Sequence, residues 1–379
     1  EGMADPMRRV VQALSKDMLL YCPVAVKEDF QSAIAYLIRR LDENTGPENF
    51  LRYTFGLTPG SKEWEDQVLK FSQSCHAMDI TFAGPRRTQN RFDAAPLYSV
   101  DAAFDNEPDT DFSLPINRKW AVEIALEWQQ KKIDSIPCLI GGKEIFHNDP
   151  EGKGYSPSHP QSVLYTYTQA SWEEVNSSIE CAQKAQNFWQ NISIREKAEL
   201  FAKAAQTLRK YRKDLIGVMM LDGGKTILEG DPEVSEAIDF VEYYLRSMLE
   251  MHSHKELSWA PKGLILIAPP WNFPVSIPTG GIFAALAAGN CVLFKPAPEA
   301  VLSGWVLIKA LWEAGIPKDV LQFINCTDDP VGSQLILDSR IHAVILTGAT
   351  ATARLFMKMR PDLRSEERRV GKECLRLCR

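Results

Sequence analysis

The chain has 379 residues, of which 45% are hydrophobic and 24% charged, a composition typical of globular proteins with room for two or more domains. Its formal net charge of −6 argues against nucleic acid or an anionic membrane surface as the main partner. No apolar run reaches the roughly 18 residues of a membrane span, and the first residues lack the apolar region of a signal peptide, so we expect a cytoplasmic protein. The eight cysteines form no CxxC pair and share no zinc-type spacing with the six histidines, so we expect no disulfide framework and no metal.

The first half of the chain is predicted to be mainly helical. Residues 8–20 and 28–43 have helical apolar spacing and flank a strand-like "YCPVAV". Residues 57–118 are rich in proline, glycine and charge, which is typical of a linker, with one helix predicted at 62–74. Helices return from about residue 119. Ser171 with Glu174 forms a capping box, the stretch 193–221 has period-3.6 apolar positions, and Pro232 is suitably placed in the first turn of a helix over 232–250.

Strands and helices alternate from residue 263 onward. The apolar runs "GLILIAP", "CVLFKPA", "VLQFIN" and "HAVILTG" are continuous, which predicts parallel strands covered on both faces. We therefore expect an α/β fold with a Rossmann-like parallel sheet, whose ligands lie at the carboxyl ends of the strands. These ends carry Pro269–Asn272, Lys295, Asn325 and Thr347–Gly348.

The stretch "APPWNFPVS" places one amide side chain, Asn272, among three prolines at the end of the first of these strands. A rigid amide donor can stabilise an oxyanion, a contribution of roughly 3–4 kcal/mol, whereas the alternative is a turn asparagine that bonds to neighbouring backbone. Lys295 suits a ribose hydroxyl or a phosphate, and the alternative is a solvated lysine at a strand end. The segment "TGATATA" opens a helix whose free N–H groups suit a pyrophosphate, although the GxGxxG pattern is absent.

Four motifs together, "LDGGKT", "PEVSEAIDF", "PWNFPVSIPTGGIFAALAAGNCVLFKPAPEA" and "ILTGATATA", resemble the aldehyde dehydrogenase superfamily over residues 140–363. The resemblance implies that Asn272 donates to the thiohemiacetal oxyanion and that Lys295 binds the adenosine ribose of NAD. The further NAD-binding positions that it implies are Ala268, Pro269, Pro270, Trp271, Ala297, Gly332, Thr347, Gly348, Ala349 and Thr352. Pro298 stands where the family has an acidic residue, with Glu299 one position later, which leaves the choice between NAD and NADP open.

The N-terminal segment "LLYCPV…YLIRRLDENTGPENFLR" resembles the end of a proline dehydrogenase (β/α)8 barrel. From the residues alone, Arg39 and Arg40 could equally belong to a solvated basic helix. The resemblance implies that both arginines bind the carboxylate of proline, that Glu43 orients them, and that Tyr36 and Tyr21 form walls of the pocket.

The order of the two resemblances is that of the proline utilisation A family of bifunctional enzymes. Such enzymes oxidise proline on FAD to pyrroline-5-carboxylate, which opens to glutamate semialdehyde, and then oxidise the aldehyde to glutamate with NAD. The resemblance implies that Phe273 packs on the aldehyde chain. It also implies that FAD belongs to the full-length parent only, and we expect that parent to be a homo-oligomer.

We expect four segments: the end of the proline dehydrogenase barrel (1–56), a linker (57–118), the NAD-binding part of the aldehyde dehydrogenase domain (119–363) and a tail foreign to the family (364–379). The family's nucleophilic cysteine and general-base glutamate belong downstream of the last predicted strand, where the chain reads "RSEERRVGKECLRLCR". Cys374 and Cys378 lack the family's surroundings, so we expect this chain to be inactive. Two alternatives are a non-catalytic NAD-binding or scaffolding module, and another aldehyde dehydrogenase with an unrelated N-terminal region.

Overall fold

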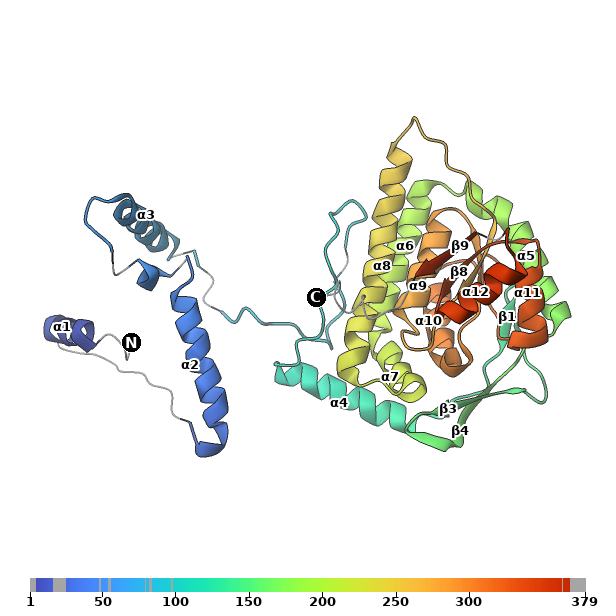
Figure 1. Cartoon of the computed structure of the whole chain (residues 1–379), viewed down its shortest axis with the longest axis horizontal. Helices are drawn as coiled ribbons and strands as arrows, with labels where there is room; N and C mark the ends of the chain where they lie inside the picture. The colour runs from blue at the N-terminus through green and yellow to red at the C-terminus, as the bar shows by residue number, and fades with distance from the viewer. Residues whose placement is uncertain are drawn as a thin grey trace. The chain divides into compact units, whose positions relative to one another are not determined.

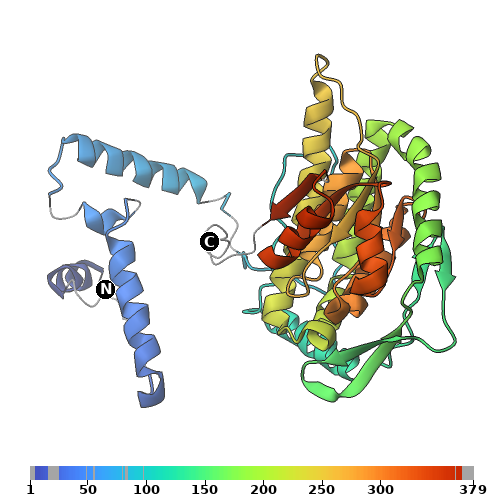
Figure 2. The same cartoon turned by 45° about the vertical axis from the view of Figure 1, so that its right-hand side comes forward.

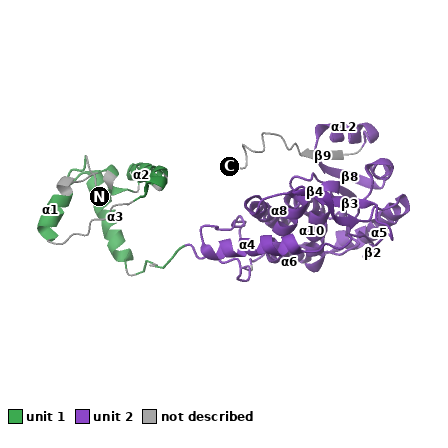
Figure 3. Ribbon diagram, turned by 90° about the horizontal axis from the view of Figure 1, so that it is seen from below, with its two compact units in different colours: residues 1–86 green, residues 87–379 purple. Residues whose placement is uncertain are grey.

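The structure, a computed structural model, describes residues 5–15, 25–47, 49–53, 56–78, 80–81, 84–96, 98–362 and 364–368. Contacts divide the chain into two compact units, Glu1–Arg86 and Arg87–Arg379 (Figure 3). The boundary falls inside the range 57–118 that was predicted as a linker. Within the described residues, no helix is both long and apolar enough to cross a membrane.

The described part of the first unit contains the α-helices α1 (Asp5–Ser15), α2 (Phe30–Asn44) and α3 (Lys62–Ala77). They overlap the helices predicted at 8–20, 28–43 and 62–74, although residues 16–20 lie outside the described part of the chain. Ser61 begins α3, because its hydroxyl accepts the N–H of Trp64 at 3.2 Å. The predicted strand-like piece over 21–26 is not a strand at residues 25–26, and its residues 21–24 lie outside the described part of the chain.

Five long helices precede the parallel strands of the second unit: α4 (Pro115–Gln130), α5 (Trp172–Asn191), α6 (Ile194–Lys210), α7 (Arg212–Gly223) and α8 (Ile227–Ser253). The capping box of Ser171 and Glu174 is confirmed at the start of α5. The helical stretch 193–221 is two helices that separate at Tyr211. The prediction that a helix starts at residue 232 is wrong: Glu229 accepts the N–H of Thr226 at 2.9 Å, so α8 begins there and Pro232 lies inside it.

The main sheet has seven strands in the order β2-β1-β7-β6-β5-β8-β9. Strands β5 (Leu264–Ala268), β6 (Cys291–Phe294), β7 (Leu321–Phe323), β8 (Ile341–Thr347) and β9 (Arg364–Arg368) are parallel. Two further strands extend the sheet beyond β7: β1 (Cys138–Ile140) is antiparallel to β7, and β2 (Lys143–Ile145) is antiparallel to β1. The predicted α/β class with a Rossmann-like sheet is confirmed, whereas β1, β2 and β9 were not predicted.

A separate two-stranded hairpin, β3 (Gly152–Ser156) and β4 (His159–Tyr167), was also not predicted. Its pairing depends on two glycines that lie under tyrosine rings. A Cβ atom on Gly152 would come within 2.2 Å of the Tyr167 ring, and one on Gly154 within 2.0 Å of the Tyr165 ring.

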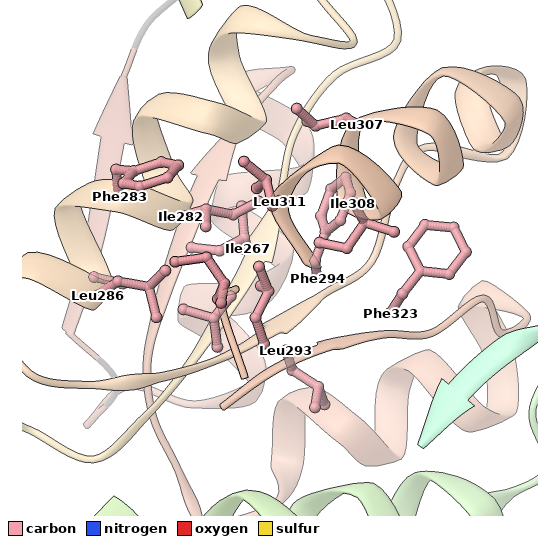
Figure 4. Packing of buried hydrophobic residues seen from close by; sticks show 14 of the residues in the cluster. Ile267, Ile282, Phe283, Leu286, Leu293, Phe294, Leu307, Ile308, Leu311 and Phe323 are labelled. Carbon is pink, nitrogen blue, oxygen red and sulfur yellow. The ribbon is translucent and has the colours of Figure 1, made fainter. Parts of the chain in front are cut away.

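Helices α9 (Ser276–Ala287), α10 (Val301–Glu313), α11 (Ser333–Leu337) and α12 (Thr350–Met359) follow the parallel strands. The yellow α8 and the green α5 lie on opposite sides of the strands in both views (Figure 1, Figure 2). Both faces are therefore buried, as the continuous apolar strands predicted. Ile267, Phe294 and Phe323 from three adjacent strands meet Phe283 of α9 and residues of α10 in this core (Figure 4).

Within the second unit, buried ion pairs join the segment before α4 to helices α6, α7 and α8. The carboxylate of Glu107 accepts Arg209 Nε at 2.8 Å and an N–H of Arg212 at 2.9 Å. Asp231 of α8 accepts from Arg212 at 3.0 Å and from the hydroxyl of Thr110 at 2.6 Å. Since these charged side chains are at most 5% exposed, the network fixes residues 107–110 against α6, α7 and α8.

Candidate active site at the carboxyl edge of the sheet

The parallel strands bring their following segments to one edge of the sheet. Lys295, just after β6, donates its backbone N–H to Ile267 of β5 at 3.0 Å, so it lies beside the end of β5. Ala268 of β5 pairs with Leu346 of β8 one residue before Thr347. The turn of Asn272, the lysine and the Thr347–Gly348 segment therefore share this edge, which is where ligands bind in open α/β sheets.

Asn272 lies in the turn between β5 and α9, and its side chain makes no hydrogen bond to the described protein. Trp271 is 54% exposed and Phe273 is 39% exposed, while Asn272, Pro269 and Pro270 are half-buried. Within the described residues no protein group hydrogen-bonds to the Asn272 amide, although a turn asparagine that satisfied nearby backbone would do so. The amide can therefore donate to a ligand.

Two charged residues that the sequence analysis did not single out support this turn. Glu233 of α8 is buried, and its carboxylate accepts the N–H groups of Val275 at 2.8 Å and Ser276 at 3.2 Å. Burial raises the pKa of Glu233, against the effect of its ion pair with Lys225. The Lys225 ammonium also lies 4.1 Å from the centre of the Phe273 ring.

Lys295 has an acidic partner that was not predicted. Its ammonium lies 3.2 Å from a carboxylate oxygen of Asp328, in the segment after β7. The Lys295 side chain is 15% exposed and that of Asp328 is 84% exposed, so the pair is open to solvent on the acidic side. Glu299 is exposed in the short turn Pro298–Ala300, and Ala297 is half-buried just before it.

The remaining predicted nucleotide-binding residues lie on the segments after β7 and β8. Gly332 is required by the backbone, because a Cβ atom there would come within 2.8 Å of the carbonyl oxygen of Thr327. Gly348 has the opposite surroundings, since its Cβ would meet only one side-chain atom, at 4.0 Å. Ala349 is exposed just before α12, and Thr352 in the first turn of α12 donates its backbone N–H to Ala349 at 3.0 Å.

Unsatisfied polar atoms also gather after β7. Both amide atoms of Asn325 and the hydroxyl of Thr327 are buried and have no hydrogen-bond partner in the described structure. Buried polar atoms are rarely left without a partner, and nothing in the described structure shows what satisfies these three. The open space above Gly348 leaves room for a ligand to approach the backbone at the end of β8.

The described cysteines offer no nucleophile near Asn272. Burial raises the pKa of Cys138 and Cys291 to about 12 and that of Cys326 to about 11. Cys75 is exposed but belongs to the first unit. Within the described residues there is also no group of three or more potential metal ligands.

In the first unit, α2 brings together part of the predicted proline site. Arg40 pairs with Glu43, and its guanidinium lies 5.2 Å from the centre of the Tyr36 ring. Arg39 is exposed on the same helix, and Tyr21 lies outside the described residues. The helix also exposes large apolar side chains, at Leu37, Ile38 and Leu41, to about half of their surface.

Family comparisons place both parts of the chain. Residues 147–366 match the aldehyde dehydrogenase family, and residues 1–53 match proline dehydrogenase. The chain belongs to the aldehyde dehydrogenase family. More narrowly, the predicted resemblance to proline utilisation A is confirmed: the chain aligns with the crystal structure of proline utilization A from Bdellovibrio bacteriovorus over 98% of its own length, at 27% identity and a TM-score of 0.74.

Other similar proteins match about two thirds of the chain. The 1-pyrroline-5-carboxylate dehydrogenase of Staphylococcus haemolyticus is 32% identical over 259 residues, which cover 66% of this chain and 50% of that protein. A structure of 1-pyrroline-5-carboxylate dehydrogenase from Thermus with bound NAD has 28% identity and a TM-score of 0.65, over 71% of this chain and 55% of that one. The chain therefore spans about half the length of the curated relatives that it matches, and 37% of the Bdellovibrio protein.

Proposed function

We propose that the protein containing this chain oxidises L-glutamate γ-semialdehyde, formed from pyrroline-5-carboxylate, to glutamate with NAD. The observation that carries the proposal is the untied amide of Asn272 at the ligand edge of an aldehyde dehydrogenase sheet. The similarity to 1-pyrroline-5-carboxylate dehydrogenases supports this choice of substrate.

Each residue of the site has a part in this proposal. When a nucleophile adds to the aldehyde, its oxygen becomes an oxyanion, and the Asn272 Nδ2 donates to it, a stabilisation of roughly 3–4 kcal/mol. Phe273 packs on the carbon chain of the substrate. Bound NAD supplies the electron acceptor. Lys295 and Asp328 hold its adenosine ribose, with Ala297 and Glu299 nearby and Gly348 leaving room for the dinucleotide.

Turnover by the complete protein tests the proposal. Pyrroline-5-carboxylate and NAD should yield NADH, and Asn272→Ala should lower kcat by about 100- to 1,000-fold. Asn187→Ala, which changes an exposed asparagine on α5, should leave kcat unchanged. No NADH from the wild-type protein, or full activity in the Asn272 variant, would refute it.

We also propose that FAD-dependent proline oxidation is coupled to this step. The match of residues 1–53 to proline dehydrogenase supports a carboxylate site formed by Arg39, Arg40 and Glu43, with Tyr36 and Tyr21 as walls. On this proposal residues 1–56 end the barrel and 57–118 link it to the dehydrogenase part at 119–363, whereas residues 364–368, predicted as the start of a foreign tail, pair with β8 as strand β9 of the main sheet. Replacing Arg39 and Arg40 together should abolish proline oxidation while pyrroline-5-carboxylate oxidation persists; retained proline oxidation would contradict the carboxylate site.

For the 379-residue chain by itself we propose NAD binding without turnover. The support is that the open space above Gly348 belongs to the described residues, whereas burial raises the pKa of each described cysteine of the second unit: Cys138, Cys181, Cys291 and Cys326. Isothermal titration should show saturable NAD binding, and an aldehyde should produce no NADH. Robust NADH production by the purified chain would show that a nucleophile has been overlooked.

A further inference from the structure

The turn that carries Asn272 has two backbone anchors, and a side chain provides one of them. On its N-terminal side, the turn leaves β5 at Ala268, which is paired in the sheet with Leu346. On its C-terminal side, Glu233 accepts the N–H groups of Val275 and Ser276, three and four residues after Asn272. Because no group among the described residues hydrogen-bonds to the amide of Asn272, its direction is set through this backbone.

Glu233 provides what α9 lacks in its own sequence. Helices leave their first N–H groups unsatisfied, and a polar side chain at the N-cap normally accepts one of them. The N-cap residue of α9 is Val275, which has no such side chain, and the hydroxyl of Ser276 is buried without a partner. A carboxylate from α8 therefore caps the helix that begins directly after the turn.

Lys225 joins the carboxylate to the residue beside Asn272. Its ammonium forms an ion pair with Glu233 and lies against the face of the Phe273 ring. The lysine backbone is itself held in place: Gly224 takes the left-handed conformation at φ 65° that ends α7, and the Lys225 N–H donates to Met219 at 3.1 Å. The two charged residues thus contact the turn on both sides of Pro274.

We propose that Glu233, held by Lys225, is a positioning residue for the Asn272 amide. It touches neither substrate nor cofactor, and it acts by fixing where the turn becomes α9. A displacement of about 1 Å at a reacting centre can cost on the order of 100-fold in rate, so this support affects catalysis as well as folding. The inference rests on the proposed aldehyde oxidation.

The test uses the complete protein with pyrroline-5-carboxylate and NAD. Glu233→Ala removes the acceptor and should lower kcat by about 10- to 100-fold, with the Kd of NAD unchanged. Glu233→Gln keeps an acceptor oxygen for the two amides and should recover a large part of kcat. Glu229→Gln is the matched control: it alters the start of the same helix, contacts Thr226 rather than the turn, and should keep kcat within about twofold.

A local measurement separates positioning from general destabilisation. Hydrogen exchange of the 379-residue chain should show faster exchange at Val275 and Ser276 in Glu233→Ala and wild-type rates there in Glu229→Gln. An unchanged kcat in Glu233→Ala overturns this inference alone. A parallel fall of kcat, NAD affinity and melting temperature in both Glu233 variants also overturns it, in favour of a purely structural role. Absence of NADH formation by the wild-type protein overturns the proposed function and this inference with it.

Discussion

Replacing Glu107 by glutamine should destabilise the second unit strongly. The Glu107 carboxylate balances the positive charges of two buried guanidinium groups. Removal of one partner from a buried ion pair lowers the free energy of unfolding by about 3–5 kcal/mol. Arg209 keeps a carboxylate of Glu242 at 3.1 Å and Arg212 keeps Asp231 at 3.0 Å. Since each arginine retains one partner, we expect the low end of that range, about 3 kcal/mol, or a melting temperature lower by about 5 °C for a unit of this size.

Tryptophan fluorescence during thermal unfolding measures the effect, because eight of the nine tryptophans belong to the second unit and only Trp64 to the first. Asp101→Asn is the matched control. It removes another contact between the segment before α4 and α6, the pair with Arg195, but both side chains are more than half exposed. This control should leave the unfolding midpoint unchanged within error. Equal shifts in the two variants, or none in Glu107→Gln, would refute the reasoning that the buried network stabilises the fold.

Three other outcomes follow from charges and burial. In the 379-residue chain, Asp328→Asn should raise the affinity for 2′,5′-ADP relative to that for 5′-AMP severalfold, as measured by titration calorimetry, because it removes a negative charge beside Lys295. Equal changes in the two affinities would contradict this. The carboxylates of Glu174 and Glu151 accept hydrogen bonds from the imidazole and raise the pKa of His147 above its ordinary 6.5. The stabilisation that they give is therefore complete below that value and is lost as pH rises through the folded-state pKa. His147→Gln should therefore flatten the fall in urea midpoint between pH ~5.5 and ~8.5, and an unaltered fall would contradict it. Finally, iodoacetamide should modify Cys75 but spare Cys326 in the folded chain, as judged by peptide mass spectrometry; equal labelling would show that Cys326 is accessible.

Local sequence was sufficient to predict the elements whose signals are local. The apolar runs at 264–268 and 291–294 are strands because burial on both faces selects continuous hydrophobic residues. The prolines around Asn272 and the capping box at Ser171 likewise act within a few residues of themselves. These local features were sufficient to predict the parallel strands, the edge at which they end and the turn that carries Asn272.

The support of the site could not be predicted from such signals. Val275 follows Glu233 by 42 residues, and the ion pair of Glu107 with Arg212 spans 105 residues, so only the folded chain shows these partners. Glu233 did carry one signal: it lies four residues before the buried Ala237, on the apolar face of α8. A carboxylate on such a face needs a partner, and the sequence does not show which residue that partner is.

Strand β2 has a consequence for how the protein behaves in concentrated solution. A sheet ends with a row of unpaired N–H and C=O groups, which can recruit a strand from another molecule. Here the last strand beyond β1 is only three residues long, and both Lys143 and Glu144 are exposed on it. Short charged edge strands disfavour such recruitment, so this edge of the sheet resists growth into aggregates.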